Sequence, residues 1–227
     1  MDPYRTIAPF YDACTEALLR APRRLMVEVC VRAGARRLLD MGCGTGALAA
    51  MARERADQVV GLDRSAFMLA AGSRKRAAES SRRAADRPEN GSGGRNDAGG
   101  TVSARLAFVR GDAAYPPFAP GSFDALLYSL MLHETEADAL HLLDTGFRLA
   151  PLAVILEWRM PERNLDVLAT SWVHVVERLA GRGHYARFRA FMRDGGVRGL
   201  ARRAGADILS ERALAGNSLV LAVLRRA

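Results

Sequence analysis

The segment LLDMGCGTGALA, residues 38–49, constrains the fold of this chain more than any other stretch of its sequence. An apolar run ends in Asp40, three glycines follow shortly after it, and an alanine-rich stretch comes next. Glycine adopts backbone conformations that other residues avoid, and without a side chain it lets a ligand approach the backbone closely. The pattern therefore predicts a strand, a tight ligand-binding turn at Gly42, Gly44 and Gly46, and then a helix.

Strand-like and helix-like segments alternate along most of the chain. Apolar runs bounded by turn residues predict strands at 36–41, 58–62, 106–109, 125–129 and 152–158. Helical spacing predicts helices at 4–20, 22–33, 47–55, 65–76, 134–149, 163–181 and 185–204, the last one broken near Gly195 and Gly196. Two apolar segments around a turn at 215–217 predict a final antiparallel pair. Such alternation is typical of an α/β domain with a doubly wound, mostly parallel sheet.

We expect one domain over residues 1–227, because a 49% hydrophobic chain of this length can build one core. The helices within 1–35 would form a cap on it. Residues 77–103 differ from the rest, since their only apolar side chains are alanines and Val102. Ordering such a segment costs about 1.5 kcal/mol per residue, and it buries too little surface to offset this cost. We therefore interpret it as a disordered insertion.

The chain is basic, with a net charge of +8, and a basic balance is typical of proteins that bind nucleic acid or anionic surfaces. About half of this charge lies in residues 74–95, mostly within the predicted insertion. Arginine supplies nearly all of it, since Lys75 is the only lysine, and this indicates a genome-wide preference for arginine. Charge alone therefore makes a nucleic-acid partner an alternative and not the first hypothesis.

The cysteines and the N-terminus indicate the compartment. Cys14, Cys30 and Cys43 form no Cys-x-x-Cys pair, so we expect reduced thiols in a cytoplasmic protein. No apolar run approaches the roughly 18 residues of a membrane span. The first residues show no basic segment followed by an apolar one, so we expect no secretory signal.

The glycine turn is compatible with two kinds of nucleotide ligand. Gly42–Ala47 fits G-x-G-x-x-A, which also occurs in dinucleotide-binding proteins, and both kinds of site use an acid such as Asp63 after the second strand to bind ribose hydroxyls. Three features separate them. Asp40 would repel a pyrophosphate but suits a ligand with an ammonium and a sulfonium group. Asp112 follows the third strand, where it can accept from an adenine amino group. The final antiparallel pair is absent from a plain dinucleotide fold.

With these motifs the chain resembles the class I S-adenosylmethionine-dependent methyltransferases. The resemblance rests on LLDMGCGTGALA, VVGLDRS, FVRGDAAYPPFAPGSFDALLYSLMLHE and LARRAGADILSERALAGNSLVLAVL, and covers about residues 36–76 and 105–225. The chain is most similar to the small-molecule branch with the ubiquinone/menaquinone C-methyltransferases (methyltransferase type 11). The resemblance implies a Rossmann-like sheet of seven mostly parallel strands with an antiparallel C-terminal strand. It also implies S-adenosyl-L-methionine as cofactor, S-adenosyl-L-homocysteine as product, and a small-molecule acceptor.

The resemblance also implies roles for individual residues. The methionine end of the cofactor site would be shaped by the first motif, at Asp40, Gly42, Cys43, Gly44 and Gly46. Asp63 would bind the ribose diol, with Arg64 and Ser65 flanking the adenine. Asp112 and Ala113 would recognise the adenine, and Tyr128 and Ser129 would lie beside the methyl group.

Methyl transfer is an in-line displacement whose main demand is alignment, so a base is needed only where the acceptor arrives protonated. His133 and Glu134, near the end of the fourth strand, are the candidate bases, and the neutral imidazole of His133 is available near pH 7. Tyr128 is a further catalytic candidate. The segment HETEA is a near miss for the zinc motif H-E-x-x-H, since Ala137 replaces the second histidine, so we predict no metal site.

The acceptor pocket is expected between the N-terminal helices and an aromatic-rich lid after the fifth strand. The lid residues are Trp158, Arg159, Trp172, His174, His184, Tyr185, Phe188, Phe191 and Met192. Such a lid suits a flat or apolar small molecule. An RNA or protein methyltransferase, a non-catalytic S-adenosylmethionine-binding regulator and a dinucleotide oxidoreductase remain alternatives. No N/D-P-P-Y/F motif follows the fourth strand, which disfavours a nucleic-acid target.

Overall fold

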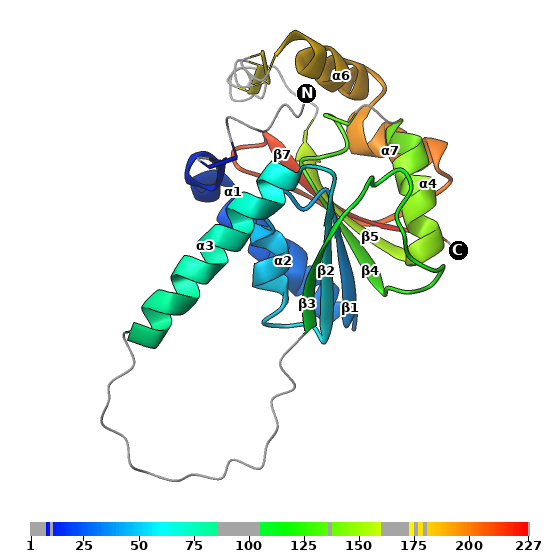
Figure 1. Ribbon diagram of the computed structural model, residues 1–227. Coiled ribbons are helices and arrows are strands. Elements are labelled where there is room, and N and C mark those ends of the chain that lie inside the picture. The colour runs from blue at the N-terminus through cyan, green and yellow to red at the C-terminus, as the bar shows by residue number, and fades with distance from the viewer. Residues whose placement is uncertain are drawn as a thin grey trace.

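The structure is a computed structural model that describes residues 8–9, 11–85, 105–135, 138–159, 173–174, 177–178 and 181–226. A single seven-stranded sheet runs through it in the order β3-β2-β1-β4-β5-β7-β6 (Figure 1). The strands are β1 (Arg37–Met41), β2 (Gln58–Asp63), β3 (Arg105–Arg110), β4 (Ala125–Ser129), β5 (Leu152–Trp158), β6 (Asp207–Leu214) and β7 (Leu219–Arg225).

The sheet confirms the predicted fold class. The pairs β1–β2, β1–β4, β2–β3 and β4–β5 are parallel, whereas β7 is antiparallel to both β5 and β6. Every residue of β5 is buried, as expected for a strand covered on both faces. The strand order reverses between β1 and β4, and in open α/β sheets ligands bind outside the carboxyl ends of the strands at such a point.

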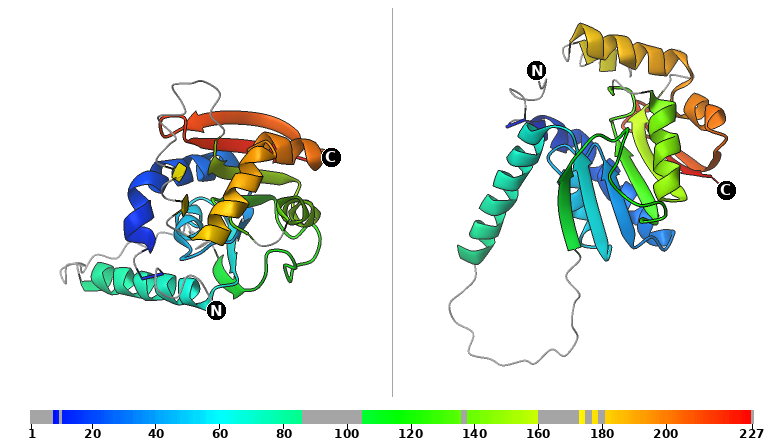
Figure 2. Two further views of the ribbon diagram at one scale, coloured as in Figure 1. Left: turned by 90° about the horizontal axis from the view of Figure 1, so that it is seen from above. Right: turned by 45° about the vertical axis from the view of Figure 1, so that its right-hand side comes forward.

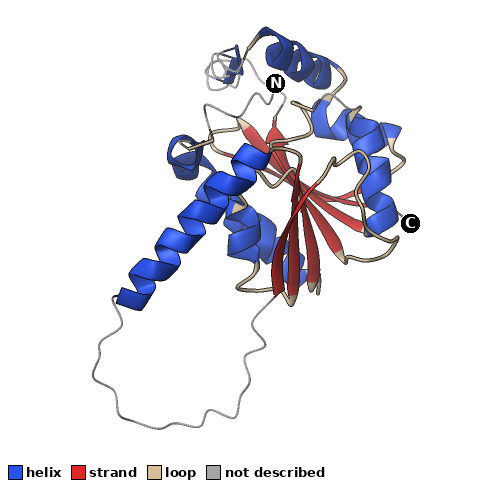
Figure 3. Cartoon of the chain, in the orientation of Figure 1, coloured by secondary structure: helices blue, strands red, loops and turns tan. Residues whose placement is uncertain are grey.

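Helices cover both faces of the sheet (Figures 1 and 3). They are α1 (Tyr11–Arg32), α2 (Ala47–Ala52), α3 (Ala66–Ala85), α4 (Ala139–Leu149), α6 (Arg182–Arg193) and α7 (Gly196–Arg203). One core cluster joins α1 and α2 to the sheet through residues such as Met26 and Leu48. The other joins α4 and α7 to the opposite face through residues such as Leu142 and Leu200. The two further views show α6 lying across the end of this assembly (Figure 2).

Several predicted element boundaries change. The two predicted N-terminal helices are one helix from Tyr11 onward, with Pro22 inside it, so the proline alone does not end the helix. The helix predicted at 134–149 begins at Ala139, because the Asp138 side chain caps it by accepting from the Leu140 N–H at 3.0 Å. The helix predicted at 47–55 ends at Ala52.

Helix α3 is longer than predicted, and this changes the predicted insertion. It runs through Ala85, so the first part of the 77–103 segment is helical and not disordered. Residues 86–104 lie outside the described residues, as does most of the helix predicted at 163–181. The break predicted in the helix at 185–204 is confirmed, because α6 and α7 meet at Gly195 and Gly196, which have φ of 92° and 57°.

None of the helices in the described parts of the chain has the length and apolar character needed to cross a membrane.

Candidate functional site

A cavity of about 480 Å³ opens at the carboxyl ends of the parallel strands. The turn after β1 supplies Gly42 and Gly44 to its wall, and β2 supplies Leu62 and Asp63. The segment after β3 adds Gly111 to Tyr115. The last residue of β4, Ser129, lines the cavity too, and the segment after β4 adds Leu130, Met131, Glu134 and Thr135. The cavity therefore lies at the switch point between β1 and β4, where the fold places ligands.

The glycine turn is held by backbone hydrogen bonds and by one carboxylate. Gly42 and Cys43 donate to the Leu62 carbonyl at 2.8 and 3.0 Å. Asp63 Oδ2 accepts from the Gly44 N–H and Oδ1 accepts from the Ser65 N–H, both at 2.7 Å. Asp63 thus joins the turn to the start of α3 and still lines the cavity. The predicted pairing of this motif with an acid after the second strand is present in the fold.

The turn accepts only glycine at the positions that face the cavity. Gly42 and Gly44 have φ of 69° and 57°, a region that side chains disfavour. A Cβ on Gly42 would also lie 3.0 Å from the Met131 side chain, and one on Gly44 would lie 3.0 Å from Met68. The backbone is therefore the surface that this part of the wall offers to a ligand.

The opposite side of the turn packs against α3, which the sequence did not reveal. A Cβ on Gly72 would lie 1.8 Å from the Thr45 carbonyl oxygen, which also accepts from Arg76 Nη1 at 2.8 Å. A glycine inside an otherwise regular helix was the available signal, since such a residue often marks a close backbone approach.

Three residues of the first motif do not line the cavity. Asp40 is 1% exposed and lies behind the turn, where Oδ2 has no hydrogen-bond partner among the described residues. Burial raises the pKa of Asp40 to about 7, although Arg23 and the Ala49 amide favour its charged form. Cys43 packs toward Gly61, and a Cβ on Gly46 would lie 2.2 Å from Phe108. These three residues pack beneath the turn, on the side away from the cavity. The predicted contact of Asp40 with the methionine end of the cofactor therefore has no support in this geometry.

The other predicted cofactor residues lie along the cavity. Arg64, Asp112, Ala113 and Ser129 all line it, and the Asp112 side chain accepts from the Ala114 N–H at 2.9 Å. Ser129 Oγ is buried and has no hydrogen-bond partner among the described residues. A buried hydroxyl without a partner is costly, so a bound ligand at this place would satisfy it.

Tyr128 is a core residue, contrary to its predicted position beside the methyl group. Its side chain is 0% exposed and packs under α4, where the hydroxyl donates to the Leu142 carbonyl at 3.1 Å. A Cβ on Gly146 would lie 2.1 Å from this hydroxyl, so the helix is shaped around the ring. Alternate strand residues point to opposite faces, and Tyr128 points away from the cavity. The predicted catalytic and cofactor roles of this side chain have no support here.

His133 is buried in a network of carboxylates and does not line the cavity. Its Nδ1 donates to Glu157 Oε2 at 2.6 Å, and its Nε2 lies 3.5 Å from Glu177 Oε1. Burial disfavours the charged ring, but these carboxylates outweigh it and raise the pKa of His133 to about 10. This environment favours the charged ring near pH 7, so the predicted base role of His133, which needs the neutral ring, gains no support from this geometry and stays a prediction.

Sequence reasoning missed several residues of the cavity wall, among them Tyr11, Met131, Thr135, Asp138 and His141, whereas Glu134, the other candidate base, does line it. Tyr11 comes from α1, and burial raises the pKa of its phenol well above its ordinary value. His141 donates through Nε2 to the Ala114 carbonyl at 3.1 Å and packs against Tyr115, which is 78% exposed. The helical pattern of α1 gave no signal for Tyr11, since it fitted a core position equally well.

The predicted aromatic lid does not cover the cavity. Trp158, Phe188 and Phe191 are buried, and none of the eight predicted lid residues that the structure describes lines the cavity. Trp172 lies outside the described residues. The His133 ring contacts Trp158 and Phe188 with ring centroids 6.4 and 5.9 Å apart. These aromatics therefore surround His133 and not the ligand cavity.

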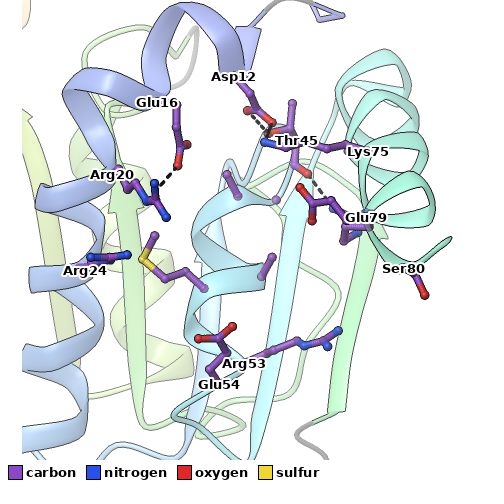
Figure 4. Close-up of a pocket in the computed structure, with 16 residues that line it drawn as sticks. Asp12, Glu16, Arg20, Arg24, Thr45, Arg53, Glu54, Lys75, Glu79 and Ser80 are labelled. Carbon is purple, nitrogen blue, oxygen red and sulfur yellow. Dashed lines mark hydrogen bonds and ion pairs between the residues drawn. The ribbon is translucent and has the colours of Figure 1, made fainter. Parts of the chain in front are cut away.

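A second groove, of about 410 Å³, lies between α1, α2 and α3 (Figure 4). Acidic and basic side chains alternate along it. Asp12 accepts from Lys75 Nζ at 2.8 Å and from Thr45 Oγ1 at 2.6 Å, and Glu16 lies 3.8 Å from Arg20. This groove lies on the outer side of the glycine turn and contains none of the residues predicted to face the adenine or ribose.

Comparisons with known proteins agree with this geometry. Residues 39–149 match a family model described as a methyltransferase domain. No curated protein matches the chain.

Solved structures that resemble the chain share its fold at low identity. An O-methyltransferase family protein from Burkholderia thailandensis has a TM-score of 0.65 at 16% identity, over 96% of this chain and 58% of its own. The 1,6-didemethyltoxoflavin N1-methyltransferase from the same organism has a TM-score of 0.59 at 15% identity, over 99% and 87%. Magnesium protoporphyrin IX methyltransferase from Synechocystis PCC 6803 has a TM-score of 0.57 at 17% identity, over 92% and 83%.

The matched segment begins inside β1 and ends with α4, and so contains the glycine turn, Asp63, Asp112 and Ser129. Residues 39–149 therefore match a methyltransferase-domain model, and the chain shares the fold of these solved methyltransferases.

Proposed function

We propose that the chain transfers a methyl group from S-adenosylmethionine to a small-molecule acceptor and releases S-adenosylhomocysteine. One observation carries this proposal: a single cavity of about 480 Å³ reaches from the glycine turn to Glu134 and His141. Small-molecule sites commonly have about 300–1,000 Å³, so a cofactor and a small acceptor can share this space. Macromolecular acceptors would need a broad surface in addition.

The described residues fit the cofactor at three places. Asp63 lines the cavity and already accepts from the Gly44 and Ser65 amides, and its carboxylate, which has about four acceptor sites, would accept from the ribose hydroxyls as well. Asp112 would accept from the adenine amino group. Ser129 Oγ, which lacks a hydrogen-bond partner among the described residues, would donate to a ligand near the reacting end. Arg64 and Ala113 would flank the adenine between these acids.

The main contribution of the protein to this reaction is to align the acceptor with the methyl group, and a catalytic acid or base is secondary. S-adenosylmethionine supplies a methyl group activated by its sulfonium. The acceptor's lone pair forms a bond to the methyl carbon while the carbon–sulfur bond breaks and the sulfur keeps the electron pair. The walls at Leu130 and Met131 would exclude water and hold the acceptor about 3–3.5 Å from the methyl carbon. Tyr11, which stays protonated, would act as a hydrogen-bond donor and not as a base.

We also propose that the reaction takes place in the cytoplasm. The described cysteines Cys30 and Cys43 are free thiols, and this favours a reducing compartment.

Titration calorimetry and labelled methyl transfer test the function together. We expect the protein to bind S-adenosylhomocysteine and not NADH, and to transfer labelled methyl groups to members of a panel of phenols, heterocycles and carboxylates. Binding without transfer to any acceptor class would favour a regulator, and transfer only to tRNA or protein would contradict the small-molecule proposal. Raised salt in the tRNA arm removes binding that depends on charge alone.

A further inference from the structure

Two histidines and three glutamates from distant parts of the chain meet beside the cavity. His133 and Glu134 follow β4, Glu157 lies in β5, and His184 lies in α6. Glu177 joins them from the short described helical piece at 177–178. His133, Glu157 and Glu177 are 3%, 0% and 4% exposed, so this His/Glu cluster is mostly buried.

Three ligand atoms of the cluster converge on one point. His133, Glu134 and His184 each offer one such atom, and these atoms lie within 4.8 Å of one another. His184 Nδ1 lies 3.8 Å from Glu134 Oε2. In a tetrahedral site with bonds of about 2.0–2.1 Å, neighbouring ligand atoms lie about 3.4 Å apart. Small side-chain rotations would therefore bring the three atoms to metal-binding distance.

In each of the two histidines, one ring nitrogen is hydrogen-bonded to a carboxylate, as is usual for histidines that bind a metal. His133 Nδ1 donates to Glu157 Oε2 at 2.6 Å, and His184 Nε2 donates to Glu177 Oε2 at 2.5 Å. His133 Nε2, which lies 3.5 Å from Glu177 Oε1, and His184 Nδ1, which lies 3.8 Å from Glu134 Oε2, are then the nitrogens left to bind a metal ion, and the ion would displace the proton that His133 Nε2 otherwise carries. A histidine that binds a metal almost always donates its other N–H to a carboxylate or carbonyl, which fixes the tautomer and the ring orientation.

Both orienting carboxylates are themselves fixed. Glu157 accepts from the Leu132 N–H at 2.8 Å and from the Trp158 N–H at 3.2 Å. Glu177 accepts from Trp158 Nε1 at 2.7 Å. Three carboxylates around two imidazoles also leave a net negative charge in a mostly buried place, which a dication would offset.

We propose that His133, Glu134 and His184 bind one divalent transition-metal ion, with Glu157 and Glu177 orienting the histidines. Two imidazoles and one carboxylate suit Zn²⁺, Mn²⁺ or Fe²⁺, whereas Mg²⁺ and Ca²⁺ prefer oxygen ligands alone. The missing histidine of HETEA is thus supplied by α6, from a distant part of the chain.

The position of the site suggests what the ion would do, and this step rests on the proposed function. Glu134 also lines the ligand cavity, and its side chain is 27% exposed. The open coordination positions would therefore face the acceptor. A bound cation would hold an acceptor oxygen and stabilise it after loss of its proton to solvent, since metal coordination lowers the pKa of a bound hydroxyl.

Cobalt titration of metal-free protein tests the site directly, because Co²⁺ gives visible d–d absorption that depends on its ligands. We expect saturation at one equivalent and displacement by Zn²⁺. His184→Ala and Glu134→Gln should each weaken Co²⁺ binding at least about tenfold, and Glu177→Gln about 10–100-fold through its effect on His184. His141→Ala, on the other side of the cavity, is the matched histidine control and should leave Co²⁺ binding unchanged.

The outcomes separate the two proposals. His184→Ala should keep its melting temperature within a few degrees and its affinity for S-adenosylhomocysteine, since His184 does not line the cavity. Equal Co²⁺ affinity in wild type and His184→Ala, or no binding by folded wild type, would overturn the metal site and leave the proposed function intact. A protein that binds Co²⁺ with the expected spectrum but not S-adenosylhomocysteine would keep the site and contradict the function.

Discussion

The two ends of the ligand cavity are built in different ways. At the glycine turn, short-range elements from β1 to α3 are joined by backbone hydrogen bonds, and one carboxylate, Asp63, holds two of the amides. Beside the far end, where Glu134 lines the cavity, the His/Glu cluster is joined by side chains from β5, from α6 and from the piece at 177–178. The first construction depends on backbone shape and the second on side-chain chemistry, so substitutions should affect them differently.

The largest expected effect tests the backbone-built end. Asp63→Ala removes the acceptor for the Gly44 and Ser65 amides and for a ribose diol. Charge-assisted hydrogen bonds contribute about 1.5–3 kcal/mol each, so affinity for S-adenosylhomocysteine should fall about a hundredfold or more. Calorimetry measures this affinity. The control is Asp57→Ala, because Asp57 directly precedes the first residue of β2, at the end of the strand away from the cavity. Unchanged affinity with an intact fold would remove Asp63 from the site.

The packing behind the turn gives the next largest effect. Alanine usually stabilises a helix by about 1 kcal/mol relative to glycine. At Gly72 the new methyl group would meet the Thr45 carbonyl, and overpacking should lower the free energy of unfolding by about 2 kcal/mol. Gly183→Ala in α6 is the matched control, since its Cβ would lie 3.6 Å from Arg187, an ordinary contact. Denaturant unfolding measures the stability of both variants. An equal increase in the free energy of unfolding at both positions would show that Gly72 is not tightly packed against Thr45.

Asp40 gives a smaller effect that depends on pH. The pKa of Asp40 is raised from 3.8 to about 7 in the folded protein. At a pH between these two values, the carboxyl is protonated in the folded state and ionised in the unfolded state. Asp40 therefore favours folding at low pH, and this contribution disappears as the pH rises through about 7. Asp40→Asn, which cannot ionise, should gain about 1 kcal/mol of stability relative to wild type between about pH 6 and pH 7.5. A difference that does not change with pH would show that Asp40 stays charged.

The smallest effect concerns the segment beyond α3. We predict that residues 87–103 are dispensable, and replacing them with about seven Gly/Ser residues should change the closure free energy by less than about 1 kcal/mol. The melting temperature and the affinity for S-adenosylhomocysteine should both be preserved. A sharp fall in the melting temperature would show that the segment contributes to stability. A sharp fall in affinity would show that it contributes to the cofactor site in addition to the glycine turn.

The same contrast explains what the sequence could predict. The sheet, the turn and Asp63 follow from short-range patterns, because strand period, glycine spacing and a following acid all lie within a few dozen residues. The inward or outward direction of Tyr128 depends on which face of β4 meets α4, and no local pattern gives it. The partnership of His133 with His184 depends on where α6 lies against β5, so HETEA alone was insufficient to predict it.

The contact between Gly72 and Thr45 also limits how ligands can enter and leave. Because α3 sits against the turn with no space for a methyl group, the turn and the helix must move together or not at all. Opening of this wall would also break the Asp63 bonds to Gly44 and Ser65. We therefore expect exchange of cofactor and product to pass the segment after β4, at Leu130 and Met131. The speed of turnover would then be set by motion of a segment that touches the glycine motif but is not part of it.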